Sequence, residues 1–526
     1  MKTRTLVLIL ISVLTVTDLY AQYFKEKDIK WAKSQFMARR QDVLANHELL
    51  WQKGNNFIIL YNTKPAYEYN GDEIGDVYFV QMNLETEEAT HLKLKLKDEN
   101  GERHWHRLHT IGDTIYMFST AQNKKNSTFD IFVETINKEP LEYSNDIRKI
   151  GDISYGGNVA GDELTNFIVT SSPNKEFLLL SYAIIDGNKR INFGIQVLNK
   201  NLEVVWKREG DFPQIEGKDI RLENYYIDND ANVYFTQNRF DGSNKIEESY
   251  LNCFPANSQN PVVKKIELQG GFHPLSSLIF SNSKGNVIYS GFYSFSKLES
   301  ALGVYSIAYS LGLKEVLEQD IRPFDDSFIT KGLSEKEAKN VLENKAKNKD
   351  FNDNFAYQMG RPILRNDGGY SIVAENKKIA IQKSKSSSMS AMGNIIHYHF
   401  NDIIVLTYDE KGKLKWMQKI PKIQKLTGHD ALFGSFSANI DSHDNIYIVF
   451  KEHSGSSMSA KALPKLFTLD SSGNNSSQNL FEDNQDLRKE FAPLLIHKLS
   501  ESKYLLGCIR PSRRGTPIEW GTIDIE

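Results

Sequence analysis

Apolar and polar positions alternate along most of this chain, in short runs separated by polar turns. Residues 439–450, which read NIDSHDNIYIVF, show the pattern: an extended segment enters, a polar turn follows, and an alternating apolar segment leaves. Alternation with period two is typical of half-buried β-strands, and Asp, Asn, Gly and Ser favour tight turns. We therefore interpret this stretch as a β-hairpin.

The same pattern occurs eight times along the chain. The turns of the predicted hairpins lie at residues 53–56, 112–113, 173–174, 228–231, 282–285, 366–368, 441–445 and 500–502. Most are roughly 55–60 residues apart, and periods of this order indicate propellers or other repeat arrays. Four strands with their connections fit this length, so each hairpin is predicted to belong to one four-stranded unit.

Closing such an array into a ring leaves only short, protected sheet edges. The predicted fold class is therefore all-β, a β-propeller over residues 47–526, with eight blades favoured by the hairpin count and seven as the alternative. The last unit lacks an obvious fourth strand before Glu526, so an N-terminal strand is a candidate to close the ring.

Two helices interrupt the strand pattern. Ile29, Ala32, Phe36 and Val43 recur at helical spacing, which predicts an amphipathic helix over residues 26–45 of an N-terminal segment, 22–46. The connection 325–358 between units five and six is predicted to contain a second helix. There, Ser334 followed by Glu337 forms a capping box, and Ala338, Val341, Leu342 and Lys345 line one face.

Residues 1–21 have the features of a signal peptide. Lys2 and Arg4 precede an apolar run at 6–16, and Leu19 and Ala21 approximate the spacing of a cleavage site after Ala21. A retained N-terminal anchor is the alternative. We expect an exported protein, periplasmic or extracellular, with no membrane span in its mature part, because no later stretch is long and apolar enough.

The charge of the chain is nearly balanced. Removing residues 1–21 deletes Lys2, Arg4 and Asp18, so the net charge moves from −3 to −3 − 2 + 1 = −4. No concentrated basic stripe with interleaved aromatic residues is present, so nucleic acid is not an expected partner.

The chain contains only two cysteines, Cys253 and Cys508. Disulfide bonds are therefore not expected to be what holds the fold together. In an eight-blade ring they belong to opposite blades, so we expect them to be unbonded.

Two outer-strand corners have a similar sequence. Residues 199–206 read NKNLEVVW and residues 409–416 read DEKGKLKW. Both resemble the repeat of pyrroloquinoline-quinone-dependent dehydrogenases, the quinoprotein propellers. The resemblance implies a propeller of that general shape and carries no cofactor residues, so no cofactor is predicted. Trp206 and Trp416 are expected to pack between neighbouring blades, since buried aromatic side chains dominate such cores.

Histidines and aspartates provide the candidate metal ligands. On a strand, His104 and His106 would point to one face and His109 to the other, so we interpret His104 and His106 as candidates for facing the central channel. A metal site would need further ligands from other blades, so no metal is predicted. Residues 228–232 begin like a calcium loop, but Val233 and Arg239 occupy positions that require Gly and Glu.

The sequence contains none of the common catalytic or phosphate-binding motifs. Propeller enzymes can still assemble carboxylates and histidines from several blades, which no local pattern reveals. A hydrolase or lyase acting on a polysaccharide or peptide is therefore the alternative function. A component of an envelope complex is a third.

Three insertions suggest a binding surface instead. The pentapeptide SSMSA occurs at 387–391 and again at 456–460, each time between the second and third strands of its unit. In a four-stranded blade, these connections leave from the same face as the 325–358 insertion, over blades five to seven. We hypothesise that this face binds a protein or glycan partner, without chemistry of its own, through Lys385, Ser388, Met389, Ser457, Met458 and the helix at 334–346. Harmless loop decoration is the alternative.

Overall fold

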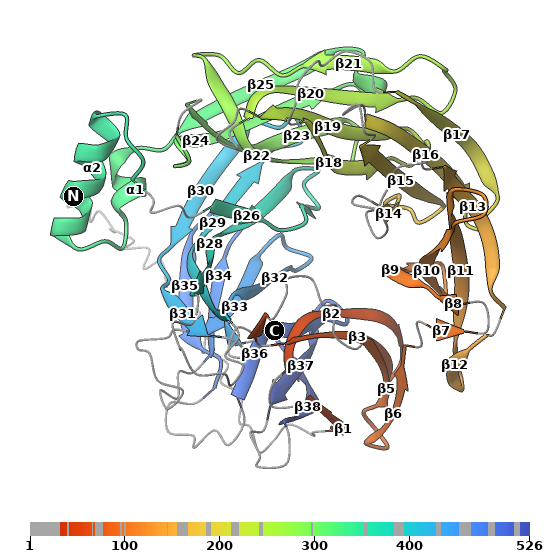
Figure 1. The fold of residues 1–526 in the computed structure, drawn as a ribbon. Helices are drawn as coiled ribbons and strands as arrows, with labels where there is room; N and C mark the ends of the chain where they lie inside the picture. The colour runs from red at the N-terminus through yellow and green to blue at the C-terminus, as the bar shows by residue number, and fades with distance from the viewer. Residues whose placement is uncertain are drawn as a thin grey trace, which may run out of the picture.

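A computed structural model describes residues 32–525 of the chain, apart from 39–41, 66, 69–76, 95–96, 99–100, 145, 155–166, 186–190, 212–219, 241–245, 296–297, 352–355, 383–393, 428–432, 452–463, 482–489 and 510–515. Eight antiparallel sheets stand around a central axis and form an eight-blade β-propeller (Figure 1). In each blade the first strand lies nearest the centre and the last strand lies at the rim. The prediction of eight blades is confirmed.

The strands of blades 1 to 4 follow one another in chain order. Blade 1 contains β2 (Asp42–Lys53), β3 (Asn56–Pro65), β5 (Val77–Asn83) and β6 (Glu88–Lys93). Blade 2 contains β9 (His104–Ile111), β10 (Thr114–Asn123) and β11 (Thr128–Lys138), with both β12 (Leu141–Tyr143) and β13 (Arg148–Ser154) paired to β11. Blade 3 contains β14 (Ile168–Ser171), β15 (Phe177–Ile185), β16 (Ile191–Asn199) and β17 (Val204–Asp211). Blade 4 contains β18 (Ile220–Ile227), β19 (Val233–Phe240), β20 (Ile246–Phe254) and β21 (Val262–Lys265).

Blades 5 to 8 complete the ring. Blade 5 contains β22 (Phe272–Ser281), β23 (Val287–Phe295), β24 (Gly303–Tyr309) and β25 (Val316–Pro323). Blade 6 contains β26 (Ala356–Met359), β27 (Ile363–Leu364), β28 (Tyr370–Gln382), β29 (Asn394–Tyr408), β30 (Leu414–Ile420) and β31 (Gln424–Thr427). Blade 7 contains β32 (Phe436–Ile440), β33 (Ile446–Lys451), β34 (Pro464–Leu469) and β35 (Asn475–Asn479). Blade 8 contains β36 (Glu490–Lys498), β37 (Lys503–Ile509), β38 (Thr516–Asp524) and β1 (Ala32–Ala38).

The N-terminal segment is strand and not helix where the structure describes it. β1 pairs with β38 from Ala32 opposite Trp520 to Ala38 opposite Thr516, and β2 begins at Asp42. The predicted helix over 26–45 is therefore wrong for residues 32–38 and 42–45, while 22–31 lie outside the described residues. The free edge of β38 provides backbone partners that outweigh a weak helical periodicity. The expectation that an N-terminal strand closes the ring is confirmed.

The recurrent turn is held by one carboxylate. Asp441 Oδ1 accepts hydrogen bonds from the backbone N–H groups of His443 and Asn445, and its Oδ2 accepts from Asn445 Nδ2 and Tyr447 Oη. Asp228 makes the same four bonds in blade 4, to Asp230, Asn232 and Tyr234. The aspartates that begin like a calcium loop therefore serve as turn caps, whose oxygens are already saturated by protein donors.

Apolar clusters join neighbouring blades. Leu179 and Val197 of blade 3 pack with Val233 and Phe235 of blade 4 in one such cluster. The two tryptophans of the repeated corner take part, as expected. Trp206 Nε1 donates to Ala231 O of blade 4 at 3.0 Å, and Trp416 Nε1 donates to Ser471 O of blade 7 at 3.1 Å.

Two α-helices occur in the described part of the chain, α1 (Asp326–Thr330) and α2 (Glu335–Ala346), and both belong to the predicted insertion. The described residues also include the 3-10 turn η2 (Leu311–Leu313) and three short strands outside the blade pattern, β4 (Tyr67–Glu68), β7 (Lys97–Asp98) and β8 (Gly101–Glu102). In the same residues, no helix has the length and apolar character needed to cross a membrane. Cys253 in β20 and Cys508 in β37 are buried free thiols, which confirms that they are not bonded to each other.

Candidate functional site

The helical insertion is fixed to blade 5. Its last residues hold the connection between β23 and β24, because Asp350 Oδ1 accepts from the backbone N–H groups of Glu299 at 2.6 Å and Ser300 at 2.9 Å. Phe351 N donates in turn to Ser300 Oγ at 2.9 Å. The insertion joins blade 5 to blade 6, whereas the connection that it contacts joins the second and third strands of blade 5. These two kinds of connection therefore lie on the same face of the ring.

The start of each helix follows from its sequence. Asp325 caps α1 by accepting from Phe328 N at 2.7 Å. Ser334 and Glu337 form the predicted capping box of α2. Between the helices, Gly332 adopts φ of 85° against Pro421, where an added Cβ would lie 2.5 Å from Pro421 Cβ. Only glycine allows this close approach of the insertion to the end of β30.

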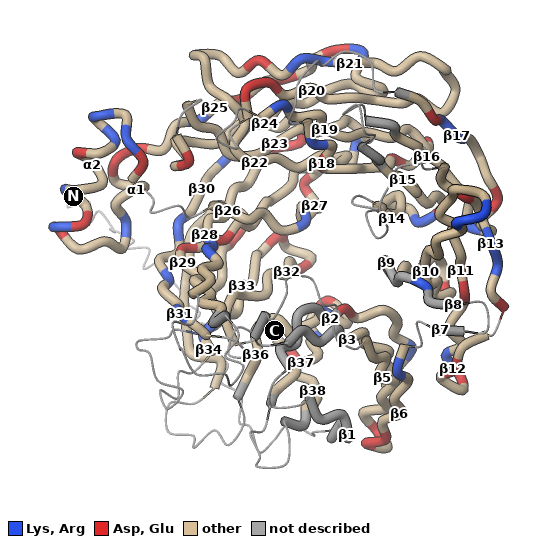
Figure 2. Tube along the Cα trace, viewed as in Figure 1, with Lys and Arg blue, Asp and Glu red and all other residues tan. Residues whose placement is uncertain are grey.

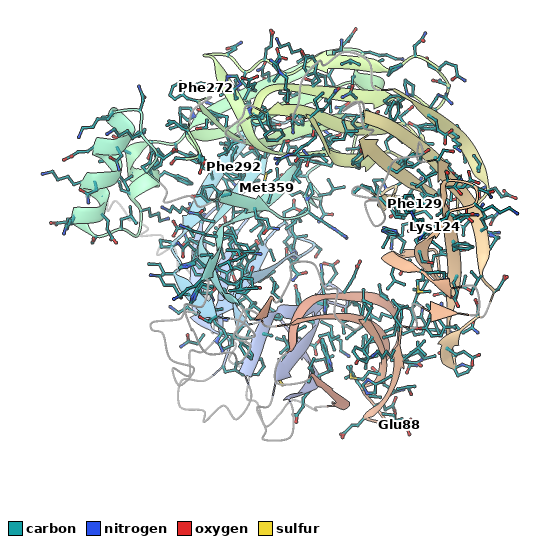
Figure 3. All side chains as sticks on the ribbon, in the orientation of Figure 1. Glu88, Lys124, Phe129, Phe272, Phe292 and Met359 are labelled. Carbon is teal, nitrogen blue, oxygen red and sulfur yellow. The ribbon has the colours of Figure 1, made fainter. Side chains whose placement is uncertain are left out.

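Aromatic side chains anchor the insertion on blades 5 and 6. Phe324 stacks on Phe328 with ring centroids 4.7 Å apart, and Phe292 stacks on Tyr357 at the same distance. These rings join an apolar cluster that also includes Ile329. Phe292 and Met359, which packs against this cluster, are labelled in Figure 3 at the junction of the two blades.

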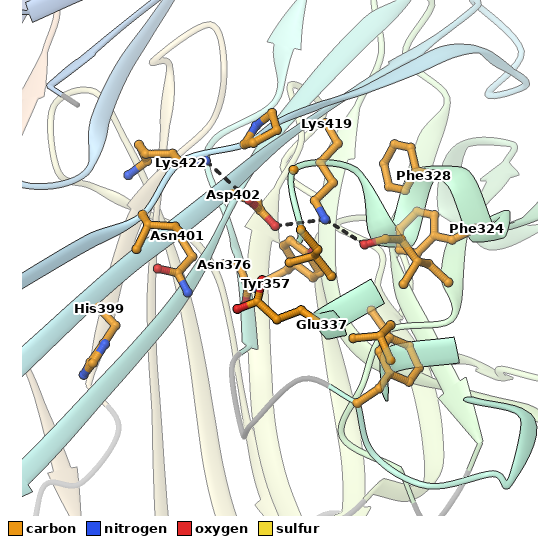
Figure 4. A pocket seen from close by; sticks show the side chains of 18 of the residues that line it. Phe324, Phe328, Glu337, Tyr357, Asn376, His399, Asn401, Asp402, Lys419 and Lys422 are labelled. Carbon is orange, nitrogen blue, oxygen red and sulfur yellow. Dashed lines mark hydrogen bonds and ion pairs between the residues drawn. The ribbon is translucent and has the colours of Figure 1, made fainter. Parts of the chain in front are cut away.

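A pocket of ≈ 690 Å³ lies between this insertion and blade 6 (Figure 4). One side is apolar and carries Phe324, Phe328, Ile329, Leu333 and Val341. The other side is polar and comes from β28, β29, β30 and the segment that leads into β31. Its residues are Asn376, Lys378, His399, Asn401, Asp402, Lys419, Lys422 and Lys425. Pockets of this size and mixed lining are typical of sites for small ligands.

The polar wall contains a cross-strand row of basic side chains. In the register of blade 6, Lys378 of β28 lies opposite His399 of β29, which lies opposite Lys425 of β31. Residues directly opposite on one face have Cβ atoms about 5 Å apart. The pKa of His399 is lowered by burial and by the nearby charges of Lys425, Lys378 and His397. Figure 2 marks the basic positions of this part of the ring.

The carboxylates of the pocket are already bonded. Asp402 Oδ2 lies 3.0 Å from Lys419 Nζ, which also donates to Ile329 O of α1. Glu337 accepts from Ser334, and these hydrogen bonds lower its pKa. Glu337 is therefore not arranged as a general acid, which requires a raised pKa, and Asp402 is engaged in an ion pair.

A buried polar network lies behind the pocket wall, between blade 6 and blade 7. Lys422 Nζ lies 2.5 Å from Glu375 Oε1 and donates to Gln424 Oε1 at 2.7 Å. Ser435 at the start of blade 7 donates from Oγ to Glu375 Oε2 and from its backbone N to Gln424 Oε1. Gln424 Nε2 donates to Lys451 O at the end of β33. The network therefore ties the pocket wall of blade 6 to blade 7.

The predicted binding residues Lys385, Ser388, Met389, Ser457 and Met458 lie outside the described residues. The strand ends that lead to them are described. Lys378 and His399, near the ends of β28 and β29, line the pocket, and Lys451 at the end of β33 bonds to β31. The strand ends that flank these two connections therefore lie on the face that carries the helical insertion. β4, from the connection between β3 and β5 of blade 1, also reaches this area, where it pairs with Asn394 and Ile395 of β29.

Two of the three histidines of β9 contact the start of blade 3. A bulge at His106 shifts the register between β9 and β10. His106 is half-buried, its Nε2 lies 2.7 Å from Thr120 Oγ1, and its ring lies 4.6 Å from that of Phe167. His109 bonds to Val169 O, so both rings contact residues that begin blade 3. Strict alternation along β9 predicts that the side chains of His106 and His109 point to opposite faces of the strand. The bulge at His106 interrupts that alternation, and both rings contact blade 3. The backbone of His104 lies in β9.

Sequence reasoning missed the pocket wall. The basic row depends on the pairing of three strands, and Lys378, His399 and Lys425 do not form a local motif. The available signal was the length of β28 and β29, which have 13 and 15 residues and extend beyond the other strands of their blade. In the part of the chain that the structure covers, no group of three or more His, Cys, Asp or Glu side chains is placed to hold a metal ion.

Comparison with known proteins does not assign the chain to a family. No protein-family model matches the chain, and no curated protein matches it. Three solved structures are similar to the chain at low identity. The β-propeller domain of the Trilobed protease from Pyrococcus furiosus has 10% identity and a TM-score of 0.32, with 86% of this chain and 98% of that chain covered. The polysaccharide lyase Uly1 has 10% identity and a TM-score of 0.37, with 82% and 93% covered. A protein of unknown function from Dyadobacter fermentans has 9% identity and a TM-score of 0.32, with 94% and 98% covered.

These similarities are limited to architecture. The resemblance of residues 199–206 and 409–416 to the quinoprotein repeat is not confirmed by any of them. The chain's own sheet topology shows that it is an eight-blade β-propeller.

Proposed function

We propose that this protein is an exported β-propeller that binds a protein or glycan partner at the pocket between α1, α2 and blade 6. The observation that carries the proposal is the pocket of ≈ 690 Å³, with aromatic side chains on one side and lysines, a histidine and amides on the other. Such a lining offers apolar contact together with a few orienting polar groups, as ligand sites do. Export, to the periplasm or the cell exterior, rests on the basic and apolar pattern of residues 1–21.

Binding is preferred over catalysis because of the state of the carboxylates. Asp402 is paired with Lys419, and Glu337 is used as a helix cap with a lowered pKa. A hydrolase or lyase acting on a polysaccharide or peptide would need an acid or base that is available for proton transfer. The pocket side chains provide contacts for a ligand, and Asp402 and Glu337 are both occupied by other interactions.

Narrowing the pocket should abolish binding without unfolding the protein. Leu333 and Ile423 line the pocket with exposed fractions of 36% and 61%, so a tryptophan at either position has room to turn into the opening. We expect the double variant Leu333→Trp, Ile423→Trp to lose at least tenfold in affinity for the ligands that the wild type selects from a panel of oligosaccharides and peptides. The melting temperature should stay nearly unchanged because both sites are on the surface.

The matched control is Leu364→Trp, at an exposed site of β27 outside the pocket lining. It should bind like the wild type. Equal binding by the double variant and the control would place the ligand elsewhere and reject the proposed site.

The two SSMSA connections form the second part of this proposal. They continue from β28 and β33, whose ends lie at the pocket wall and at β31. Replacing residues 387–391 and 456–460 by Gly-Ser turns should weaken binding of the selected ligand about tenfold, since long functional loops contribute contacts at a site's rim. Melting temperature and affinity, measured side by side, check this. Undiminished affinity would mean that the connections are decoration.

A further inference from the structure

A β-bulge brings two asparagines together at the pocket wall. The register of β28 and β29 shifts between Glu375 and Lys377, so that Asn376 of β28 faces two residues of β29, Asn401 and Asp402. Bulges of this kind change the direction of side chains and are over-represented next to active sites. Asn376, Asn401 and Asp402 all line the pocket, and Figure 4 labels them on its polar side.

The amide oxygens of Asn376 and Asn401 lack hydrogen-bond donors among the residues that the structure describes. Asn376 is 6% exposed and Asn401 is half-buried, and the Oδ1 atom of each is buried. A buried acceptor without a donor costs free energy, and the great majority of buried polar groups in proteins are bonded. Asp402, the third residue of the bulge, differs from the two amides because it is paired with Lys419.

A ligand in the pocket can supply the donors. The terminal torsion of asparagine is broad, so an amide that no protein group bonds is able to rotate about its Cβ–Cγ bond. Rotation by half a turn exchanges the oxygen and the nitrogen of the amide, which have nearly the same size. Because both side chains line the pocket, this rotation turns their oxygens toward the opening, where N–H groups of a ligand can donate to them.

Aliphatic side chains of the lining favour an apolar group on the same ligand. Leu333 and Ile423 are exposed and line the pocket together with Val341. Covering such side chains with an apolar group is favourable. A sugar ring would bring hydroxyl groups against them, and burying a hydroxyl without a partner costs free energy. The lining therefore favours a peptide, in which backbone N–H groups are separate from an apolar side chain.

We propose that the pocket binds an extended peptide whose backbone N–H groups donate to the side-chain oxygens of Asn376 and Asn401. One bulky apolar side chain of the peptide lies against Leu333 and Ile423. In complexes of this kind, backbone hydrogen bonds provide affinity and a pocket for a side chain provides sequence preference. The inference rests on the proposed function, because it names the class of partner that the same pocket binds.

Synthetic peptides with backbone esters test these hydrogen bonds. The probes are acetylated and amidated pentapeptides, Gly-Ser-Leu-Ser-Gly and its forms with Phe, Met or Ala at the centre. Their binding to the chain from Gln22 onward is measured by ligand-observed NMR. We expect at least one of the Leu, Phe and Met peptides to bind, and the Ala peptide to bind at least tenfold more weakly. An ester that replaces one backbone N–H by oxygen should weaken binding about fivefold at one position or more.

The variant Asn376→Leu separates binding from a structural role. Leucine resembles asparagine in shape and has no group that needs a donor, so the free energy of unfolding should stay the same or rise. Peptide affinity should fall about fivefold, and one of the esters that weakens binding to the wild type should bind this variant as well as the parent peptide does. Asn401→Leu should behave in the same way toward an ester at another position. Asn201→Leu, at an exposed asparagine between β16 and β17, is the matched control and should bind like the wild type.

Other results would overturn the inference, and they distinguish it from the proposed function. Binding of oligosaccharides alone, lost in the Leu333→Trp, Ile423→Trp variant, would keep the pocket as the binding site and make the peptide assignment wrong. Equal peptide affinity for the wild type and both leucine variants, or a clear loss of stability in those variants, would show that the amides do not hold a peptide backbone. Failure of every oligosaccharide and peptide to bind at the pocket would reject the proposed function as well.

Discussion

A chain shortened to begin at Asp42 should lose more than about 4 kcal/mol of unfolding free energy, beyond the range of most single substitutions. The deletion removes β1, whose backbone completes blade 8 by pairing with β38. Without it, β38 becomes a bare edge at the point where the ring closes. Trp520 and Ile518 of β38 are 0% and 1% exposed in a cluster with Phe57 and Ile59 of blade 1, so the damage extends to the contact between blades 1 and 8.

Urea unfolding followed by fluorescence measures this effect. A chain beginning at Trp31, which keeps β1, is the control and should unfold at the same midpoint as a chain beginning at Gln22. A synthetic peptide of residues 31–41, added in excess to the shortened chain, should restore part of the lost stability because it binds only the folded ring. Equal midpoints for the two chains would show that β1 is not needed for closure.

Replacing Lys422 by methionine should destabilise the protein by about 3–5 kcal/mol, because it leaves a buried carboxylate without its cation. Lys422 is 3% exposed and Glu375 is 4% exposed, and their charged atoms are 2.5 Å apart. Burial lowers the pKa of Lys422, and the charge of Glu375 opposes that shift. The remaining partner of Glu375 would be the hydroxyl of Ser435, a neutral donor.

A double-mutant cycle isolates the pair. The double variant Glu375→Met, Lys422→Met should recover about half or more of the loss, since a buried ion pair is often replaceable by apolar side chains. Lys419→Met is the comparison, because its partner Asp402 has a side chain that is 19% exposed and so is better hydrated when the cation is removed. Its cost should be clearly smaller. Similar losses for the two single variants would mean that burial of the partner is not the cause.

The blades were predictable because their signals are local. Each hairpin combines alternating apolar residues with a turn such as 441–447, in which Asp441 binds groups no more than six residues away. Because this local hairpin pattern occurs eight times in the sequence, it predicts eight blades. Trp206 and Trp416 were predictable for the same reason, since the corner that carries them repeats.

The pairing of the N-terminal strand and the contacts of His106 could not be predicted from the local sequence. Residues 32–38 are strand only because β38, at the other end of the chain, offers its edge. His106 turns to blade 3 only because a bulge adds one residue to β9. Neither the distant edge nor the bulge leaves a pattern in the residues concerned. Period counting therefore assigned residues 32–38 to a helix and placed His106 and His109 on opposite sides of their strand.

The pocket was predictable in part. The insertion and its capped helix were visible in the sequence, as was the face from which the long connections leave. The wall was not, because Lys378, His399 and Lys425 become neighbours through the register of three strands. Asn376 and Asn401 are ordinary surface residue types, and only the structure shows that they line the pocket beside that row.

The pairing of β1 with β38 also sets an order of events for synthesis and folding. β1 is the first strand that the structure describes, and its partner β38 is the last strand that it describes. Blades 1 to 7 have all their strands before β38 exists, so they are able to form while the chain is still incomplete. Contacts between distant parts of a chain form slowly, and exposed strand edges promote aggregation until they are covered. The first strand that the structure describes is therefore among the earliest to be synthesised and the last to find its partner.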